Sequence, residues 1–419
     1  MRVKQLKINN FRVINKLFID FGNTQTNVLV GVNGCGKTSI LDCLAILLSR
    51  LIGRVESKQG TGRFFTDNDI TNGSKETFNE IIITYQNQDY NFRVTKTKKG
   101  REQTKQTITN LTEIKTLAKI IRESLDEDAF ASIPLVVFYP VNRAVLDIPL
   151  RIRQKHIFDQ LAAYEGALVG GPRDFRLFFE WFREREDLEN EIRIEKKKNL
   201  DPHLEAVRNA VSSLLPGFTN LRIRRSPLRM TLEKEGTELI VNQLSDGEKC
   251  LLAFAGDLAR RLAIANPSLT NPLKGYAIVL IDEIELHLHP SWQRNIIPSL
   301  ESTFPNCQFI VTTHSPLVLS HIKPEGVHIL EMTEEGVELR KITSSYGRDS
   351  NLILEEIMGV PERPEEIKDK LRMYFNLIDK SNFLEANQLR NYLEAIIGPD
   401  EPEFAKADVL IKRKRILGK

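Results

Sequence analysis

A glycine-rich stretch near the N-terminus reads Gly31-Val32-Asn33-Gly34-Cys35-Gly36-Lys37-Thr38 and fits the pattern G-x-x-x-x-G-K-[ST]. Residues 27–30 before it predict a buried strand, and apolar residues at helical spacing from Ile40 to Leu48 predict a helix after it. Glycines allow backbone N–H groups to turn inward around a phosphate, and the helix N-terminus adds partial positive charge. The stretch therefore predicts a loop that binds the phosphates of a nucleotide.

The predicted ligands of that nucleotide, ATP, come from the loop and its first helical turn. They are Gly31, Asn33, Gly34, Cys35, Gly36, Lys37, Thr38 and Ser39. We expect Lys37 to reach the β- and γ-phosphates and to act in catalysis, and Thr38 to offer its hydroxyl to Mg²⁺.

A second motif is an apolar strand, Ala277 to Ile281, that ends in two carboxylates. Such a strand end alone is common, but paired with the phosphate-binding loop it is typical of a Walker-B arrangement. Asp282 is then expected to hold Mg²⁺, and Glu283 to orient and polarise the attacking water.

A third motif, Leu244-Ser245-Asp246-Gly247-Glu248-Lys249, resembles the L-S-G-G-[EQ] signature of ABC-type ATPases, with Asp246 in place of the first glycine. The resemblance implies that Ser245, Asp246, Gly247 and Glu248 contact the ATP held by another subunit, so that two chains form a homodimer or larger oligomer with shared sites. It also makes His314, which follows strand 308–312, the family's switch histidine at the γ-phosphate. Ser245 and Glu248 equally fit an ordinary capping box, and both interpretations can hold together.

The order and spacing of the motifs predict the organisation of the chain. From residue 245 the pattern alternates helix and strand, as in a parallel α/β sheet. The expected fold is an α/β ABC-type ATPase head, with a mixed or parallel sheet and an N-terminal antiparallel part. We divide it into an N-terminal lobe with a basic hairpin arm (1–145), a helical insertion (146–227), a C-terminal lobe (228–345) and a helical extension (346–419).

Ser245 follows Lys37 by 208 positions, a spacing too long for a typical transporter subunit and too short for a long-armed chromosome-maintenance protein. The size resembles the RecF-like, OLD-family and phage-defence ATPases of the RecF/OLD/SMC-like group. Glu283 to Pro290 is similar to the OLD-like string D-E-P-E-x-x-L-H-P, with Ile284 where proline is usual. Asn10-Phe11-Arg12 resembles the group's N-F-[RK], which implies either that Arg12 approaches the nucleotide or that it is a surface arginine.

The C-terminal part resembles the ATPase subunit of Septu-type, retron-associated defence systems. The segments that carry this resemblance are 347–354, 358–359, 362–364, 377–379 and 385–386, with 138–143 in the N-terminal lobe. It implies a separate partner nuclease. The tail contains no D-x-D set, and no H-N-H motif with cysteine zinc ligands occurs, so the nuclease is expected to be a second, small protein of the HNH type.

The composition limits the remaining possibilities for nucleic-acid binding, cellular compartment and membrane association. The 59 Lys and Arg against 56 Asp and Glu give a net charge of +3, so any nucleic-acid contact must be local. Its candidates are the basic groups at 96–105, 222–229 and 412–415, each of which could also be a solvated face. Four scattered Cys without a C-x-x-C pair, and no signal-peptide or membrane-spanning run, favour a cytoplasmic protein with no membrane partner.

These observations predict an ATP-hydrolysing ABC-type ATPase that dimerises around ATP and regulates a partner nuclease in anti-phage defence. Two alternatives stay open. One is a RecF-like, DNA-binding repair ATPase, and the other is a nucleotide-gated assembly scaffold that hardly hydrolyses ATP.

Overall fold

The computed structural model describes residues 1–100, 107–141, 158–170, 173–195, 200–342 and 344–417. The chain forms two compact units, Met1–Ser350 and Asn351–Lys419. Residues 101–105 of the basic group at 96–105 and residues 142–143 of the predicted defence-ATPase segment lie outside the described residues.

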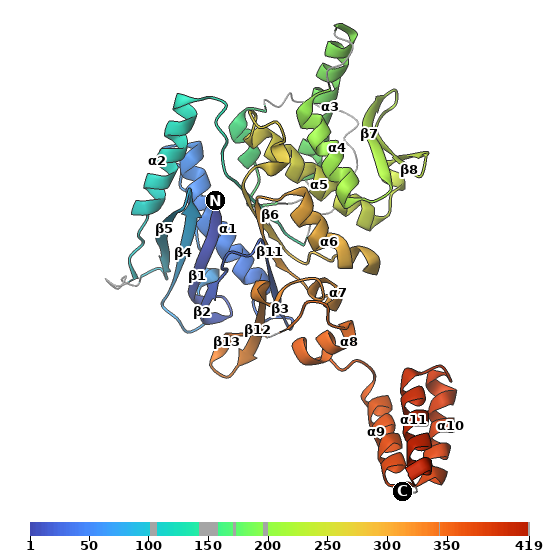
Figure 1. Ribbon diagram of the computed structural model, residues 1–419. Coiled ribbons are helices and arrows are strands. Elements are labelled where there is room, and N and C mark those ends of the chain that lie inside the picture. The colour runs from blue at the N-terminus through green and yellow to red at the C-terminus, as the bar shows by residue number, and fades with distance from the viewer. Residues whose placement is uncertain (101–106, 142–157, 171–172, 196–199, 343, 418–419) are drawn as a thin grey trace. The chain divides into compact units, whose positions relative to one another are not determined.

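The first unit is built on a six-stranded sheet with the order β13-β12-β3-β11-β10-β6 (Figure 1). The strands are β3 (Thr26–Gly31), β6 (Leu135–Tyr139), β10 (Ala277–Ile281), β11 (Cys307–Thr312), β12 (Val327–Thr333) and β13 (Gly336–Arg340). All neighbours are parallel except the β12–β13 hairpin. The prediction of an α/β fold with a mixed sheet is confirmed.

The sheet joins the two ends of this unit. Strand β3 from the N-terminal part lies between β11 and β12, with Phe309 opposite Thr26 and Val327 opposite Val28. Every residue of β10 and β11 is buried, as expected for parallel strands covered on both faces. Because parallel strands end at the same edge, the carboxyl ends of β3, β10 and β11 bring three separate motifs together.

A second, antiparallel sheet has the order β2-β1-β4-β5. Its strands are β1 (Arg2–Phe11), β2 (Ile14–Asp20), β4 (Glu76–Tyr85) and β5 (Gln88–Thr97). Strands β4 and β5 form the predicted hairpin, and β4 alternates buried and half-buried side chains, which gives the sheet one core-facing side. Helix α2 (Thr112–Glu127), which we did not predict, packs beside α1 (Lys37–Glu56).

Further helices of this unit are α3 (Arg173–Glu195), α4 (Pro202–Leu214), α5 (Asp246–Ala265), α6 (Pro290–Thr303) and α7 (Pro316–Leu319). Helices α3 and α4 pack on α5, which lies against β6. Helix α5 is almost wholly buried and carries an internal charge cluster. Its Asp257 accepts hydrogen bonds from Arg260 (2.6 Å), Arg261 (2.7 Å) and the Tyr139 hydroxyl (2.9 Å). These partners satisfy the buried carboxylate and fix α5 against β6.

The predicted boundary between residues 227 and 228 is wrong. Strand β7 (Phe218–Arg225) pairs with β8 (Leu228–Lys234), which pairs with β9 (Thr237–Ile240), so one three-stranded sheet crosses that boundary. A turn at Glu235-Gly236 joins β8 to β9, whereas β7 was not predicted, because its arginines were assigned to the basic group at 222–229. The segment between the two ATPase lobes is therefore helical only up to α4.

The second unit contains α9 (Glu365–Asp379), α10 (Phe383–Ile397) and α11 (Pro402–Leu417). They share a core of Leu371, Tyr374, Ile378, Ala386, Leu393, Phe404 and Ala407. A short α8 (Ser350–Leu352) and a π-helical turn (Ile353–Ile357) precede them. Within the described residues of both units, no helix is long and apolar enough to cross a membrane.

Candidate nucleotide site

The loop from Gly31 to Lys37 connects β3 to α1 as predicted. Residues 32–34 are exposed, whereas Cys35, Gly36 and Lys37 are buried. Gly36 caps α1 with φ 95°, and a Cβ there would lie 3.2 Å from the Ile14 side chain. A left-handed conformation with a close neighbour favours glycine, which explains the second glycine of the motif.

The amino group of Lys37 lies inside this loop. It donates hydrogen bonds to the carbonyls of Gly31 (2.8 Å) and Val32 (3.0 Å). A buried ammonium held by carbonyls of the loop fits a group that would pair with phosphate oxygens when ATP is bound. Ser39 follows at the second position of α1 and is partly exposed.

Two threonines hold the carboxylate of Asp282 at the end of β10. The Thr38 hydroxyl lies 2.9 Å from Oδ2, and the Thr312 hydroxyl donates to Oδ1 at 2.6 Å. The side chain of Asp282 is 2% exposed. A hydroxyl and a carboxylate side by side are oxygen ligands that fit Mg²⁺, so the two predicted metal ligands do meet.

The backbone of Glu283, the next residue, has φ 46°. This left-handed conformation is uncommon for residues other than glycine, asparagine and aspartate. The N–H of Glu283 donates to the Thr312 hydroxyl (2.7 Å), and the N–H of Ile284 donates to the Thr312 carbonyl (3.0 Å). Thr312 thus holds both the predicted metal ligand and the backbone of the predicted base. Sequence reasoning missed this threonine, although its place at the end of the adjacent parallel strand was a usable signal.

His314 is positioned by a second carboxylate. Glu285 accepts hydrogen bonds from the Thr313 hydroxyl (2.7 Å) and from the backbone N–H of His314. The Ser315 hydroxyl donates to Gln293 of α6 at 2.6 Å. The turn after β11 is therefore tied to the turn after β10. The positioning roles of Glu285 and Gln293 were not predicted. A signal existed for Glu285, because it is the second carboxylate of the string Glu283-Ile284-Glu285 that follows β10.

Residues 245–248, which we call the signature segment, form the start of α5, with Ser245 at the N-cap. The Ser245 N–H and hydroxyl both donate to the Glu248 carboxylate (2.8 and 2.9 Å), and the Glu248 N–H donates to the Ser245 hydroxyl (3.4 Å), which completes a capping box. Lys234 of β8 pairs with the same carboxylate at 2.7 Å. Burial alone would raise the pKa of Glu248, but Lys234 and Ser245 lower it overall. Asp246 directs a side chain that is 81% exposed into solvent.

Gly247 shows why this segment needs a glycine. A Cβ there would lie 2.3 Å from the carbonyl oxygen of His287. The signature segment and His287, His289, Ser291 and Trp292 line a pocket of about 420 Å³. Among the described residues, this lining includes none from loop 31–38. The signature segment therefore lies against the turn that follows β10.

Arg12 is engaged elsewhere. Its guanidinium pairs with Asp42 of α1 (2.6 Å) and Asp69 (3.0 Å). Burial opposes the shift, but the two carboxylates raise the pKa of Arg12 overall. Contact of Arg12 with nucleotide stays a prediction. In this structure the residue ties β1 to the second turn of α1.

The basic group at 222–229 is largely paired. Arg224 pairs with Glu238, Arg225 with Asp187 and Glu186, and Arg222 hydrogen-bonds Asn220. These internal partners weaken the case for that group as a nucleic-acid contact.

The arrangement of these motifs on one shared sheet defines an ABC-type ATPase head. A protein family described as "AAA domain, putative AbiEii toxin, Type IV TA system" matches residues 26–320. The chain belongs to this family. It is an ABC-type ATPase of the RecF/SMC-like group and is similar to retron and Septu proteins.

Three relatives match over most of their length. The Retron Ec83 probable ATPase of Escherichia coli is 33% identical over 481 residues, which cover 99% of this chain and 87% of that protein. The Retron Vc95 probable ATPase of Vibrio cholerae is 31% identical, covering 91% and 84%. The Septu protein PtuA of Bacillus thuringiensis is 22% identical, covering 96% and 95%. Among solved structures, the SMC head domain from Thermotoga maritima aligns with a TM-score of 0.46 at 17% identity, covering 82% of this chain and 100% of that one.

Proposed function

We propose that this chain hydrolyses ATP at sites shared by two copies, with loop 31–38 of one copy facing the signature segment of the other. The observation that carries this proposal is that the two motifs contact different residues of their own chain. Loop 31–38 adjoins Asp282, whereas the signature segment lines its own pocket with no residue of that loop. A two-fold dimer of such chains has two complete sites.

The residues around Asp282 fit ATP with Mg²⁺. Lys37 would exchange its loop carbonyls for phosphate oxygens, and Thr38 with Asp282 would hold the metal. When bound, Mg²⁺ supplies positive charge that stabilises the charge on the transferring phosphate. Thr312 fixes the orientation of Asp282 in advance, so little reorganisation is needed on binding.

Glu283 is the proposed general base. Its backbone is held by Thr312, so its carboxylate is presented at the strand end beside the metal ligand. There it accepts a proton from the attacking water. His314, held through its N–H by Glu285, is proposed to contact the γ-phosphate and to sense its loss.

We further propose that the dimer regulates a separate small nuclease of the HNH type in anti-phage defence. The support is the similarity over nearly the whole chain to two retron probable ATPases and to a Septu protein. In this proposal the ATP-bound dimer and the released chain are the two states that the partner distinguishes.

Light scattering of the Glu283→Gln variant tests the dimer proposal. With ATP and Mg²⁺ the variant is expected to accumulate as a dimer, because it binds ATP but hydrolyses it slowly. The same mass with and without ATP would contradict the dimer proposal.

If the wild type binds ATP but shows no turnover, the scaffold alternative is correct instead. Affinity purification together with the products of neighbouring genes tests the nuclease proposal, which fails if no nuclease is recovered.

A further inference from the structure

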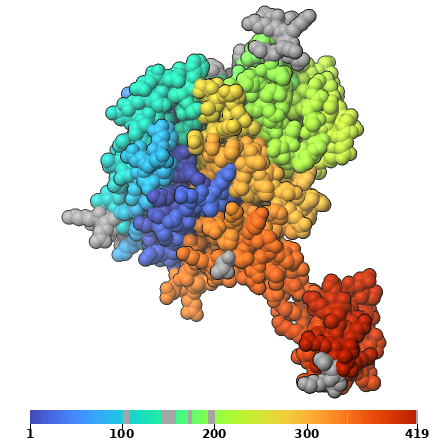
Figure 2. Space-filling model, viewed as in Figure 1, coloured from blue at the N-terminus to red at the C-terminus, as the bar shows by residue number. Residues whose placement is uncertain are grey.

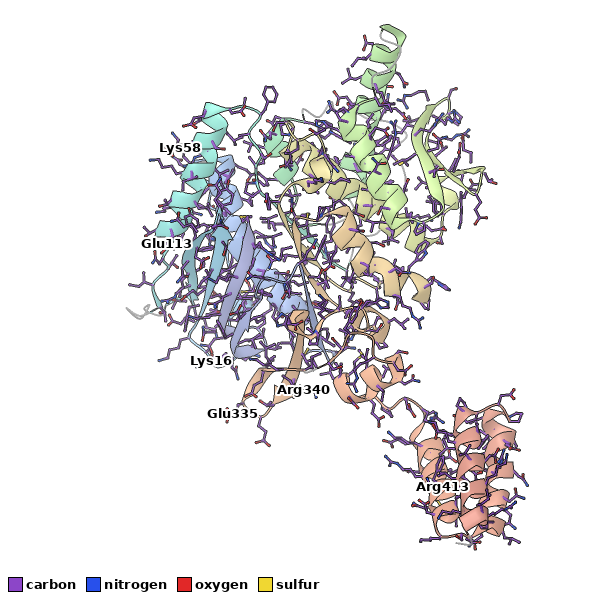
Figure 3. The ribbon with its side chains drawn as sticks, in the orientation of Figure 1. Lys16, Lys58, Glu113, Glu335, Arg340 and Arg413 are labelled. Atoms are coloured by element: carbon purple, nitrogen blue, oxygen red, sulfur yellow. The ribbon has the colours of Figure 1, made fainter. Side chains whose placement is uncertain are left out.

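The end of α1 farthest from the phosphate-binding loop carries a cluster of arginines: Arg50, Arg54, Arg63 and Arg122. Arg54 donates to the carbonyl of Arg50 (2.8 Å), and Arg122 of α2 donates to the carbonyl of Arg54. Arg63, in the loop after α1, donates to the carbonyl of Leu168 (2.8 Å). Lys58 adds a further charge at this end of the helix, as Figure 3 shows.

These guanidinium groups have no counter-ion within the described part of the chain. No described carboxylate oxygen lies within 4.0 Å of any of the four, and their hydrogen bonds go to backbone carbonyls. Arg50 is 6% exposed, and its Nε has no hydrogen-bond partner. Burial and the charge of Arg54 lower the pKa of Arg50. Uncompensated positive charge that is partly removed from water favours an external anion.

The cluster is held by a loop folded tightly onto α1. Gly62 has φ 67°, and a Cβ there would lie 2.2 Å from the carbonyl of Ser49. A Cβ on Gly60 would lie 1.6 Å from the carbonyl of Gly53. The N–H of Arg63 donates to the Ser49 hydroxyl at 2.7 Å. This contact needs glycines, and it fixes the position of Arg63 and of the residue after it.

That next residue, Phe64, is 61% exposed. The Arg50 guanidinium covers one face of its ring at 4.1 Å from the centroid. The rest of the ring is accessible at the surface. A base can stack on an accessible aromatic ring, and an adjacent arginine reinforces the stack.

Helix α2 extends the positive surface. Lys115, Lys119 and Arg122 recur at positions i, i+4 and i+7, which places them on one face over roughly 10 Å. Both lysines are exposed, and Figure 2 shows α2 at the surface of the unit. Lys119 pairs with Glu123 of the same helix at 3.4 Å, whereas Lys115 has no ion pair among the described residues. Asp126 continues this face one turn later and limits the positive stripe at that end. Cations in a row beside an exposed aromatic ring match the recognition of a nucleic-acid strand with unstacked bases.

We propose that this surface, the arginine cluster with Phe64 and the stripe on α2, binds single-stranded nucleic acid through its phosphates and one stacked base. The site goes beyond the proposed ATP hydrolysis and lies at the opposite end of the same helix. Helix α1 begins at Lys37 and spans 20 residues, so roughly 30 Å separate the two ends.

Fluorescence anisotropy of the full chain with labelled 20-nucleotide dT and rU oligomers tests the proposal. The triple variant Arg54→Gln, Arg63→Gln, Arg122→Gln is expected to weaken binding at least tenfold and to reduce the salt dependence of binding. Phe64→Leu, which keeps an apolar side chain but removes the aromatic ring, is expected to weaken it about tenfold. The matched control Lys16→Gln, Lys323→Gln, Lys341→Gln removes three exposed charges elsewhere and is expected to bind like wild type.

Thermal melting and binding of a fluorescent ATP analogue show whether each variant is folded. If the triple variant does not fold, Phe64→Leu still tests the stacking. Equal binding by Phe64→Leu and wild type, with inorganic polyphosphate competing as well as the oligomers, would overturn the assignment to nucleic acid. So would equal weakening by the control triple. Tighter, cluster-dependent binding of a duplex of the same length would overturn the preference for a single strand.

Discussion

The hydroxyl of Thr312 lies 2.6 Å from Oδ1 of Asp282 and also accepts the N–H of Glu283 at 2.7 Å. One side chain on β11 thereby holds the predicted metal ligand and the predicted base of the neighbouring strand. The Walker-B pair is fixed by the parallel pairing of β10 with β11, where Ile281 lies opposite Val311.

Replacing Thr312 by Val keeps the shape of the side chain but removes both hydrogen bonds. We expect a loss of stability of about 1–3 kcal/mol, because a buried carboxylate and an N–H lose their partner. We also expect at least a tenfold fall in kcat, since Asp282 and Glu283 lose their orientation. Thr333→Val, the same change at an exposed position of β12, is the control. Wild-type turnover in Thr312→Val would show that this threonine has no positioning role.

Glu283→Gln is expected to lower kcat about 10²- to 10⁴-fold, because the amide cannot accept the proton of the attacking water. ATP affinity should change only slightly, since loop 31–38 is untouched. Steady-state turnover and equilibrium nucleotide binding, measured on the same preparation, separate the two effects. A variant that turns over ATP like wild type would remove Glu283 from the mechanism.

Gly247→Ala is expected to destabilise the first unit by roughly 1–3 kcal/mol, because the new Cβ would lie 2.3 Å from the His287 carbonyl oxygen. Thermal melting measures the effect. Asp246→Ala, at the neighbouring exposed position, is the control and should melt close to wild type. If both variants melt at the same temperature, the carbonyl of His287 can move enough to admit a Cβ at position 247, and the expected destabilisation is wrong.

The pKa of Glu248 is lowered in the folded chain by Lys234 and Ser245, despite burial. A lowered folded-state pKa contributes stability above the unfolded-state value of 4.5, and this contribution is lost as pH falls through the folded-state pKa. Glu248→Gln can retain the capping geometry but loses the charge. It should therefore be less stable than wild type at pH 7, with the difference vanishing well below pH 4.5. Denaturant unfolding at both pH values measures this, and a difference independent of pH would contradict it.

Sequence reasoning predicted most of the fold because its signals were local. The run Ala277–Ile281 was long enough to be read as a buried strand, and Ser245 with Glu248 marked the start of α5. It failed at β7, whose arginines are neutralised by residues far along the chain, such as Glu186 and Glu238. Helix α2 was also not predicted from the sequence.

For the site, the phosphate loop and the Asp–Glu pair could be predicted because their chemistry lies in consecutive residues. Thr312 and Glu285 were missed, because their signals gain meaning only once it is known which strands are neighbours in the sheet. The same holds for Arg12, whose partners Asp42 and Asp69 come from other elements.

The most direct test of the shared site is complementation between two inactive variants. Lys37→Ala disables the loop, and Ser245→Asp keeps a capping side chain but places a negative charge toward the phosphate. Each alone is expected to be inactive. Mixed in equal amounts, they should recover about a quarter of wild-type ATP turnover, because half of the dimers then hold one intact site of two. A mixture that remains as inactive as its components would contradict the account.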